Sequence, residues 1–290
     1  MHEFLQHFLN GIISGSVLAL PALGLTLMFS VLGFANFAFA AHATLGAVAG
    51  YLVNVTLGWP VPACLLVAVV AAGAAGIVSD AVALRGLRRM RRTDAAMMVA
   101  IASIALNMAL ESAVRFLFGN DHRSFDLPLM RDVTIAGFQV SQQQAINLGY
   151  AVAMLLLLFG FFAYTRAGKA MRAVADNPDL ARLKGISAEK VALAVTFVGM
   201  GLAGAGGMLL ALETSVDPMV GSRILLMVFA ASVVGGLTSI PGAVAGSLLI
   251  GVAQELSLLV ISPTYSSAVG FIAIAFTLTL RPQGLFGRKG

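Results

Sequence analysis

The chain has 290 residues, of which 59% are hydrophobic and 11% are charged, and its mean hydropathy is +0.93. A soluble domain carries about 25% charged residues, so this composition excludes a soluble enzyme and predicts an integral membrane protein. The net charge of +5 is then expected to come from basic loops on one membrane face rather than from a nucleic-acid-binding surface.

The apolar residues occur in long unbroken runs such as Ala145–Tyr164, not in alternation. This pattern favours spanning helices over a β-barrel, because a helix satisfies its own backbone hydrogen bonds in lipid. We predict an all-α, polytopic membrane helix bundle that forms a single domain over residues 1–290. The first run is long enough to remain as a span and no Lys or Arg precedes it, so no cleavable signal peptide is expected.

Nine apolar segments are predicted to enter the membrane, and we expect eight to ten membrane elements. In chain order they are Leu9–Val31, Asn36–Val53, Pro62–Leu84, Met97–Phe118, Ala145–Tyr164, Val191–Leu212, Ile224–Gly235, Ala243–Ile261 and Ser266–Leu280. A full span needs about 20 residues. The second segment and the last three are shorter, so discontinuous helices are expected among them.

Three groups of basic residues predict the orientation. They hold 14 of the 18 Lys and Arg residues: Arg85, Arg88, Arg89, Arg91 and Arg92; Arg166, Lys169, Arg172, Arg182, Lys184 and Lys190; Arg281, Arg288 and Lys289. The spans between the groups place all three on one side, which the positive-inside rule makes cytoplasmic. The C-terminus is then cytoplasmic, and the N-terminus and the loop 119–144 lie outside.

Two breaks between apolar segments resemble each other. Residues 32–36 precede a run of small residues at 38–50, and residues 235–242 precede a similar run at 243–251. Paired interruptions in two halves of a chain are typical of a transport pathway near the bilayer midplane, although ordinary turns between spans are the alternative. Asn36, at the first break, is a candidate either for lining the pathway or for satisfying freed backbone groups.

Few ionisable residues fall inside the predicted spans. Glu111 and Arg115 share one helix face, with Asn107 one turn earlier, and Glu255 lies in the eighth span. Charges within a membrane face a partner or a wet cavity. We therefore take Asn36, Asn107 and Glu255 as pathway candidates. The alternatives are a structural ion pair for Glu111 and Arg115, and a hydrogen bond bracing two helices for Glu255.

The polar stretch 166–190 contains nine of the 31 charged residues. Asn177 is placed to cap a helix that begins at Pro178, with Asp179 beside the positive end of its dipole and Gly185 as its stop. Ser187 is placed to start the next helix. Such a structured segment between two spans is either a solvated connector or a docking element for a soluble partner.

No motif for catalysis or metal binding is found. The spacing around Gly168 and Lys169 does not match a phosphate-binding loop, and no nucleophile elbow is present. The four histidines do not form metal-spaced pairs with Asp, Glu or Cys. We expect no catalytic residue, no metal and no cofactor in this chain.

Several short motifs follow one another in a fixed order: Asn10-Gly11-Ile12, the run at 22–29, Asn36-Phe37-Ala38, the stretch 166–186, the turn at 235–242, and the ending at 281–287. Their order and spacing resemble the inner-membrane permease subunits of branched-chain amino acid ABC importers of the LivH type, over nearly the whole chain. Phe39-Ala40 stand where that family usually has His-Gly. This departure leaves the substrate open, because the family also includes amide, urea and other amino-acid importers.

The resemblance implies that residues 166–190 carry a coupling helix that seats in a groove of a cytoplasmic ATPase. The coupling residues it implies are Asn177, Pro178, Asp179, Ala181, Arg182 and Gly185. It also implies a second permease subunit, two ATPase subunits that use ATP, and an extracytoplasmic substrate-binding protein at a bacterial inner membrane. The competing interpretations are an ion-coupled secondary transporter that uses Glu111 or Glu255, and an intramembrane enzyme.

Overall fold

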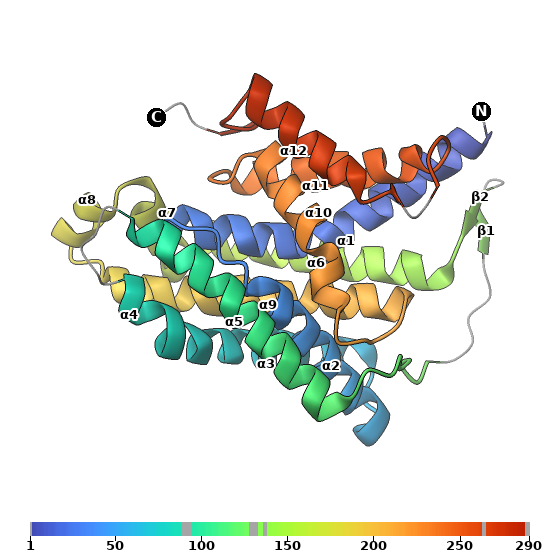
Figure 1. Ribbon diagram of the computed structural model, residues 1–290, viewed down its shortest axis with the longest axis horizontal. Helices are drawn as coiled ribbons and strands as arrows, with labels where there is room; N and C mark the ends of the chain where they lie inside the picture. Colours follow the sequence, from blue (N-terminus) through green and yellow to red (C-terminus); the bar gives the residue numbers. More distant parts are fainter. Residues whose placement is uncertain (1, 89–93, 128–132, 136–137, 263–264, 288–290) are drawn as a thin grey trace.

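The computed structural model describes residues 2–88, 94–127, 133–135, 138–262 and 265–287 as a helical bundle with a small β-hairpin at one end (Figure 1). Its helices are α1 (His2–Leu32), α2 (Phe39–Leu57), α3 (Val61–Ser79), the π-helical turn η1 (Asp80–Leu84), α4 (Arg85–Arg88), α5 (Ala95–Phe118), α6 (Gln142–Tyr164), α7 (Arg166–Asp176), α8 (Pro178–Leu183), α9 (Ala188–Glu213), α10 (Val220–Gly235), α11 (Ile240–Ser257) and α12 (Ala268–Leu280). The hairpin pairs β1 (Val133–Ile135) with β2 (Phe138–Val140).

Within the described residues, seven helical segments are long and apolar enough to cross a membrane, and α10 and α12 are shorter apolar helices. The predicted all-α polytopic bundle of eight to ten elements is therefore confirmed. The third segment runs without interruption through α3, η1 and α4.

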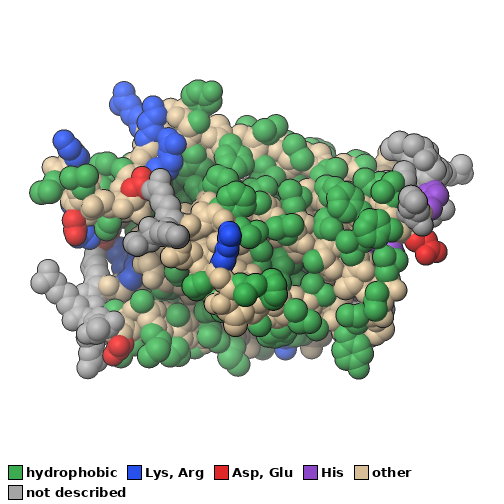
Figure 2. Space-filling model, turned by 90° about the horizontal axis from the view of Figure 1, so that it is seen from above, with side chains coloured by type: hydrophobic (Ala, Val, Ile, Leu, Met, Phe, Trp, Pro, Cys, Tyr) green, Lys and Arg blue, Asp and Glu red, His purple; other side chains and the backbone are tan. Residues whose placement is uncertain are grey.

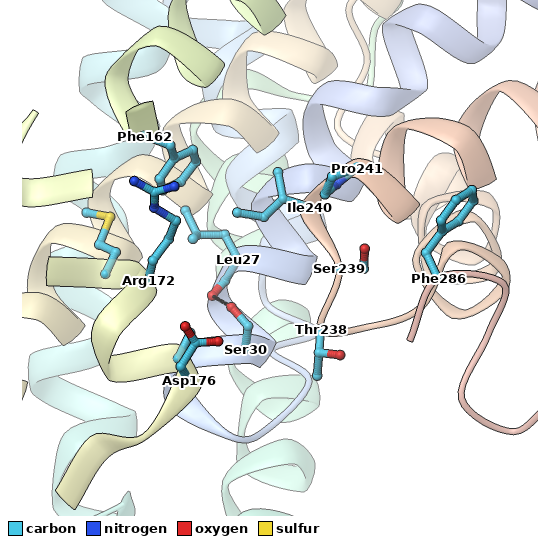
Figure 3. Close-up of a pocket in the computed structure, with 12 residues that line it drawn as sticks. Leu27, Ser30, Phe162, Arg172, Asp176, Thr238, Ser239, Ile240, Pro241 and Phe286 are labelled. Atoms are coloured by element: carbon cyan, nitrogen blue, oxygen red, sulfur yellow. Dashed lines mark hydrogen bonds between the residues drawn. The ribbon is translucent and has the colours of Figure 1, made fainter. Parts of the chain in front are cut away.

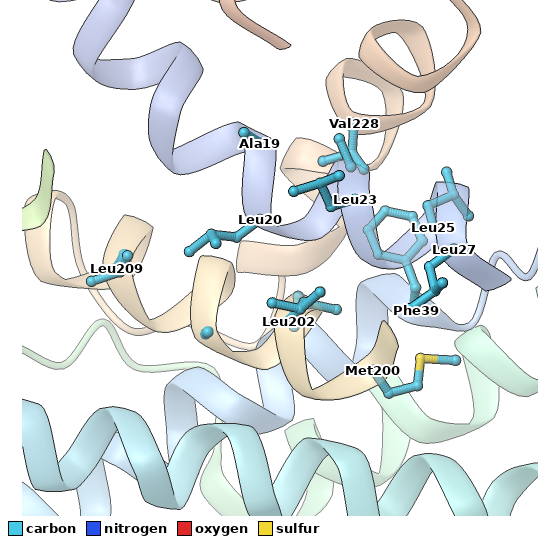
Figure 4. Close-up of a cluster of buried hydrophobic side chains, with 14 of the residues drawn as sticks. Ala19, Leu20, Leu23, Leu25, Leu27, Phe39, Met200, Leu202, Leu209 and Val228 are labelled. Carbon is cyan, nitrogen blue, oxygen red and sulfur yellow. The ribbon is translucent and has the colours of Figure 1, made fainter. Parts of the chain in front are cut away.

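Helices α1 and α9 form the centre of the bundle. They approach so closely that a Cβ atom on Gly24 of α1 would lie 2.3 Å from the carbonyl oxygen of Gly199 of α9. Small residues permit this approach, which matters in lipid because association there depends on van der Waals packing. Around this contact, Leu20 and Leu23 of α1 and Leu202 of α9 form a buried apolar cluster (Figure 4).

The packing repeats in the two halves of the chain. Helix α1 packs along α11 as α9 packs along α3, and α2 packs on α3 as α10 packs on α11. Because α1 and α9 run in opposite directions (Figure 1), the two halves are inverted relative to each other. An internal repeat is thus present, but the predicted pairing of the breaks is wrong.

The structural equivalent of the break at 33–38, which leads into α2, is the segment 214–219, which leads into α10. Residues 235–242 instead contain the short turn between α10 and α11, which corresponds to the turn at 58–60 between α2 and α3. Gly236 adopts a positive φ of 107° in this turn. Turn chemistry, not a pathway break, therefore explains the Gly-rich sequence there.

Helices α2 and α10 begin against each other inside the molecule. A Cβ atom on Gly221 of α10 would lie 1.8 Å from the carbonyl oxygen of Ala40 of α2, so the two helix starts are in direct contact. Helix α10 is too short for a full span, as expected from the short seventh segment, whereas α2 is long enough to cross a membrane. Helix α2 begins at Phe39 rather than at Asn36, and α10 begins at Val220 rather than at Ile224, which places Arg223 in its first turn.

The two termini lie at opposite ends of the bundle (Figure 1). Lys and Arg side chains gather towards one end, and hydrophobic side chains cover much of the surface between the ends (Figure 2). At the basic end, Arg85 of α4 forms an ion pair with Glu189 at the start of α9. The remaining predicted basic residues Arg89, Arg91, Arg92, Arg288 and Lys289 lie outside the described residues.

Candidate substrate pathway and coupling element

Four polar residues form a stripe on one face of α5. Ser103, Asn107, Glu111 and Arg115 follow one another at intervals of four residues, and residues at this spacing lie on the same helix face. Ser103 and Asn107 are buried, whereas the side chains of Glu111 and Arg115 are 12% and 40% exposed. The stripe reaches the starts of both α2 and α10.

Uncharged side chains accept hydrogen bonds from the backbone amides at the start of α2. The Ser103 hydroxyl accepts a hydrogen bond from the amide of Phe37 at 3.0 Å, and the Asn107 side-chain oxygen accepts one from the amide of Ala41 at 2.8 Å. The Asn36 side-chain oxygen accepts from the amide of Ala38 at 3.1 Å. The first amides of a helix have no partner within it, so these buried side chains hold the start of α2 in place.

Charged side chains dominate the start of α10. The Glu111 carboxylate accepts hydrogen bonds from the hydroxyl of Ser222 at 2.9 Å and from the guanidinium of Arg115 at 2.8 Å. The hydroxyl of Thr44, from α2, accepts a hydrogen bond from the amide of Gly221 at 3.0 Å. Glu111 and Arg115 thus form an ion pair, and this pair also contacts a helix start.

Asp217 and Arg223 form a second charged pair beside the first. Asp217 is 3% exposed; one of its oxygens accepts from the amide of Met219 at 2.7 Å, and the other lies 3.0 Å from the Arg223 guanidinium. Arg223 itself is 54% exposed. Neither residue was predicted, because this segment was expected to start at Ile224. The available signal was the turn-forming pair Asp217-Pro218 just before the apolar run.

Glu255 lies apart from Asn36 and Asn107. It lines a pocket of about 430 Å³ between α1, α9, α10 and α11, together with Ser14 and Arg223. One Glu255 oxygen lies 3.4 Å from Nδ1 of His7 on α1. Of the three pathway candidates, the structure therefore brings Asn36 and Asn107 together at α2 and places Glu255 in a separate pocket.

A second carboxylate, which was not predicted from the sequence, adjoins this pocket. Glu213, the last residue of α9, lines a smaller cavity of about 50 Å³ that shares Ser14 and Ile224 with the larger pocket. The side-chain amide of Asn147 on α6 donates to the Glu213 carboxylate at 3.0 Å. Glu213 follows a long apolar run, and its position at the end of a span made it look like an ordinary surface residue.

The polar stretch 166–190 is folded at the basic end of the molecule. The side-chain oxygen of Asn177 accepts from the amides of Asp179 and Leu180 at 3.1 and 2.9 Å, and α8 begins at Pro178. Gly185 has a φ of +79° just beyond the end of α8. The predicted cap, start and stop of this helix are confirmed.

The structure adds a helix that was not predicted, α7. The Thr165 hydroxyl caps it by accepting from the amide of Gly168 at 3.0 Å. Its Arg166, Lys169 and Arg172 alternate with buried positions, a periodicity that could have indicated an amphipathic helix.

Two leucines are exposed on α8 beside a charged pair. Leu180 and Leu183 are 55% and 84% exposed, whereas Ala181 is 4% exposed and packs against the rest of this chain. Asp179 and Arg182 form an exposed pair at 3.3 Å. Ala181 thus holds α8 against the bundle, and a partner would meet the two leucines.

A pocket of about 570 Å³ lies beside α7 (Figure 3). Arg172 and Asp176 of α7 line one side, and the turn residues Thr238 and Ser239 line the other, with Ser30 of α1 between them. The pocket separates the basic-end helices from the turn between α10 and α11. In the described part of the chain, no group of three or more His, Cys, Asp or Glu side chains could hold a metal ion.

Comparison with known proteins gives matches over nearly the full length. Residues 7–278 match the family model described as "Branched-chain amino acid transport system / permease component". The chain is 33% identical over 303 residues to the high-affinity branched-chain amino acid transport system permease protein LivH of Escherichia coli (strain K12), covering 98% of this chain and 96% of that protein.

Two further matches are to a second relative and to a solved structure. The chain is 30% identical to the high-affinity permease protein BraD of Pseudomonas aeruginosa, over 99% of this chain and 97% of BraD. A solved structure, PsaBC from Streptococcus pneumoniae in complex with Fab, aligns with 98% of this chain and 92% of that chain at 16% identity and a TM-score of 0.48. With its apolar helices and these matches, the chain is a multi-pass membrane protein that belongs to the family of branched-chain amino acid transport system permease components.

Proposed function

We propose that this chain is the transmembrane permease subunit of an ATP-driven importer of branched-chain or related amino acids. The observation that carries the proposal is the near full-length match to permease relatives whose names state this transport. In this role the chain has no catalytic residue and no cofactor of its own. ATP is hydrolysed by a separate subunit.

The proposed assembly contains a second permease subunit, two cytoplasmic ATPase subunits and an extracytoplasmic substrate-binding protein. It lies in a bacterial inner membrane, with the N-terminus outside and the basic end cytoplasmic, as the positive-inside rule requires. Cysteines introduced at Ala175 and at Ser124 test this orientation, because only the cysteine at Ser124 should react with an impermeant reagent from outside.

Helix α8 is the proposed contact with the ATPase. Leu180 and Leu183 expose apolar side chains on a helix that is capped by Asn177 and closed by Gly185. Exposed apolar side chains outside the membrane segments are suited to a protein interface. Pro178, Asp179 and Arg182 would border this contact, and Ala181 would support it from the inner side.

The proposed coupling route follows the chain. Helix α9 begins directly after α8, passes through the centre of the bundle, and leads through residues 214–219 into α10. A displacement of α8 by the ATPase would therefore reach the charged start of α10. We place the substrate pathway along the start of α10 and the Glu255 pocket, with Asn36 and Asn107 fixing the neighbouring start of α2.

Reconstitution tests the proposal. The chain is co-expressed with the ATPase, second permease and binding protein proposed as its partners, purified by an affinity tag, and inserted into vesicles. We expect the ATPase to co-purify and labelled L-leucine to accumulate only with the binding protein and ATP. Uptake that needs a proton or sodium gradient but not ATP would contradict the proposal and favour an ion-coupled transporter.

A further inference from the structure

The pocket lined by Glu255 combines charges of both signs with an apolar wall. The larger cavity and the smaller one beside it share the lining residues Ser14, Leu18, Leu210 and Ile224, and the two together are here called the α1–α10 pocket. Arg223 and Glu255 line its larger part, and Glu213 lines its smaller part. Its principal volume of about 430 Å³ is in the range of small-molecule sites, roughly 300–1,000 Å³.

The three charged groups retain capacity for a ligand. One arm of the Arg223 guanidinium lies 3.0 Å from Asp217, and a guanidinium has five donors in a planar fork. Glu213 accepts a hydrogen bond from Asn147 through one oxygen, and Glu255 lies 3.4 Å from His7 through one oxygen. Each group is thus held in place by another residue of the same chain, and this contact does not use all of its hydrogen-bonding atoms.

The charges also favour a bound cation beside a bound anion. Glu213 and Glu255 line the two adjoining cavities, and two carboxylates that share a site repel each other. A positively charged group between two carboxylates relieves this repulsion. Pro21 has no amide hydrogen, so it cannot donate to the carbonyl of Val17 one turn earlier in α1. Both residues line the smaller cavity.

We propose that the α1–α10 pocket binds the zwitterion of an apolar α-amino acid within a single permease subunit. The Arg223 guanidinium would bind the α-carboxylate, since guanidinium and carboxylate pair in a bidentate manner. Glu213 and Glu255 would bind the α-ammonium group, and Leu18, Leu210 and Ile224 would contact the side chain. The inference rests on the proposed function, from which it takes the amino-acid class of the substrate.

The test measures protection of an introduced cysteine. Ser14 lines both parts of the pocket, and the native Cys64 is buried, so a Ser14→Cys variant of the assembled transporter is labelled with a small aqueous thiol reagent. The probes are L-leucine, its methyl ester (no α-carboxylate) and 4-methylpentanoate (no ammonium group). We expect L-leucine to slow the labelling, and both analogues to require at least about tenfold higher concentrations, as for the loss of one charged hydrogen-bonded contact.

Variants that remove one charge test which side chains bind the ligand. In the Ser14→Cys background, Arg223→Gln and Glu255→Gln should each raise the L-leucine concentration needed for protection by about tenfold or more. Glu3→Gln makes the same chemical change at an exposed position and should have no effect. Arg223→Lys, which keeps the charge beside Asp217, should retain part of the protection and exclude a folding defect as the cause.

Three results would overturn the inference while leaving the proposed function intact, provided that the same vesicles show ATP-driven L-leucine uptake. These are a cysteine at Ser14 that never reacts, labelling that L-leucine does not slow, and equal protection by ammonium chloride, which would indicate a simple cation site. Absence of ATP-driven uptake despite complete assembly would count against the proposed function instead.

Discussion

Different kinds of side chain pair with the backbone amides at the starts of α2 and α10. Both helices begin inside the bundle, where the first amides need partners. At α2 the partners are the buried, uncharged side chains of Asn36, Ser103 and Asn107. At α10 they include Asp217, and the adjoining Arg223 is 54% exposed.

This difference assigns the two helix starts different roles. Buried neutral hydrogen bonds with good geometry fix one conformation, because breaking any of them leaves an unsatisfied group in a low-dielectric interior. The half-exposed guanidinium of Arg223 can exchange its protein partner for water or a ligand at low cost. We therefore expect the start of α2 to be rigid and the start of α10 to carry the conformational change and contact the substrate.

The largest expected effect on stability is at Asn107. Asn107→Leu removes the acceptor for the amide of Ala41 and should cost about 2–3 kcal/mol, since a buried donor is left unpaired. The measurement is thermal unfolding of the detergent-purified complex together with its abundance in the membrane. Asn120→Leu, at an exposed position, is the matched control. Equal unfolding temperatures for the two variants would remove the structural basis of the comparison.

At α10 the expected loss is in transport rather than in folding. Asp217→Asn keeps an acceptor for the amide of Met219 but removes the charge that holds Arg223. Because Arg223 is half-exposed, the stability cost should stay near 1 kcal/mol. Uptake of L-leucine should fall about tenfold, which corresponds to 1.4 kcal/mol. Normal uptake with a strongly lowered unfolding temperature would assign Asp217 the same structural role as Asn107.

A substitution at Gly185 tests whether α8 is the contact with the ATPase. Gly185 has a φ of +79°, and a β-branched side chain in this region costs roughly 1–2 kcal/mol. No atom lies within 4 Å of the position of an added Cβ, so strain rather than a clash is expected. Gly185→Val should preserve membrane abundance and weaken ATPase co-purification. Gly86→Val is the control, because a Cβ there also meets no atom within 4 Å and no positive φ is required.

The exposed leucines of α8 allow a more local test of the contact with the ATPase. Leu183→Asp places a charge on a side chain that is 84% exposed, so folding should be unaffected. ATPase co-purification should drop, because the contact loses apolar area and gains a charge to desolvate. Ala181→Arg is predicted to act differently: Ala181 is 4% exposed, so this change should displace α8 and lower its stability. Unchanged recovery of the ATPase with Leu183→Asp would indicate that residues 166–190 are only a connector.

The smallest effect is expected at Glu111. Glu111→Gln keeps an acceptor for Ser222 and loses only the charge facing Arg115, whose side chain is 40% exposed. The cost should be below about 1 kcal/mol, and uptake should remain within severalfold of the parent. Complete loss of uptake with intact assembly would instead point to a proton or sodium site at Glu111.

Much of the fold could be predicted from local sequence. The apolar runs gave the membrane segments, and Asn177, Pro178 and Gly185 marked the ends of α8 correctly, because helix capping depends on a few neighbouring residues. An internal repeat was predicted, but not the inverted relation of the two halves. Equivalent breaks share packing rather than sequence. The Gly-rich turn at 235–242 resembles residues 32–36 in sequence, although its structural equivalent is the turn at 58–60.

The candidate pathway depended on contacts between distant residues. Asn36 and Asn107 meet at α2, 71 positions apart in sequence, and nothing in the spacing of either residue indicated the other. Arg223 and Glu213 were missed for a different reason. Each lies at the end of an apolar segment, where a charge normally marks the membrane surface, and only the inward course of residues 214–219 places Arg223 beside a pocket.

The most direct test compares the two helix starts in one complex. Cysteines are placed at Met219, before α10, and at Ala35, before α2, and their labelling rates are measured without nucleotide and with ATP trapped by vanadate. A several-fold change of rate at Met219 with an unchanged rate at Ala35 is predicted. Equal changes at both positions, or a change at Ala35 alone, would contradict a rigid start of α2 and a moving start of α10.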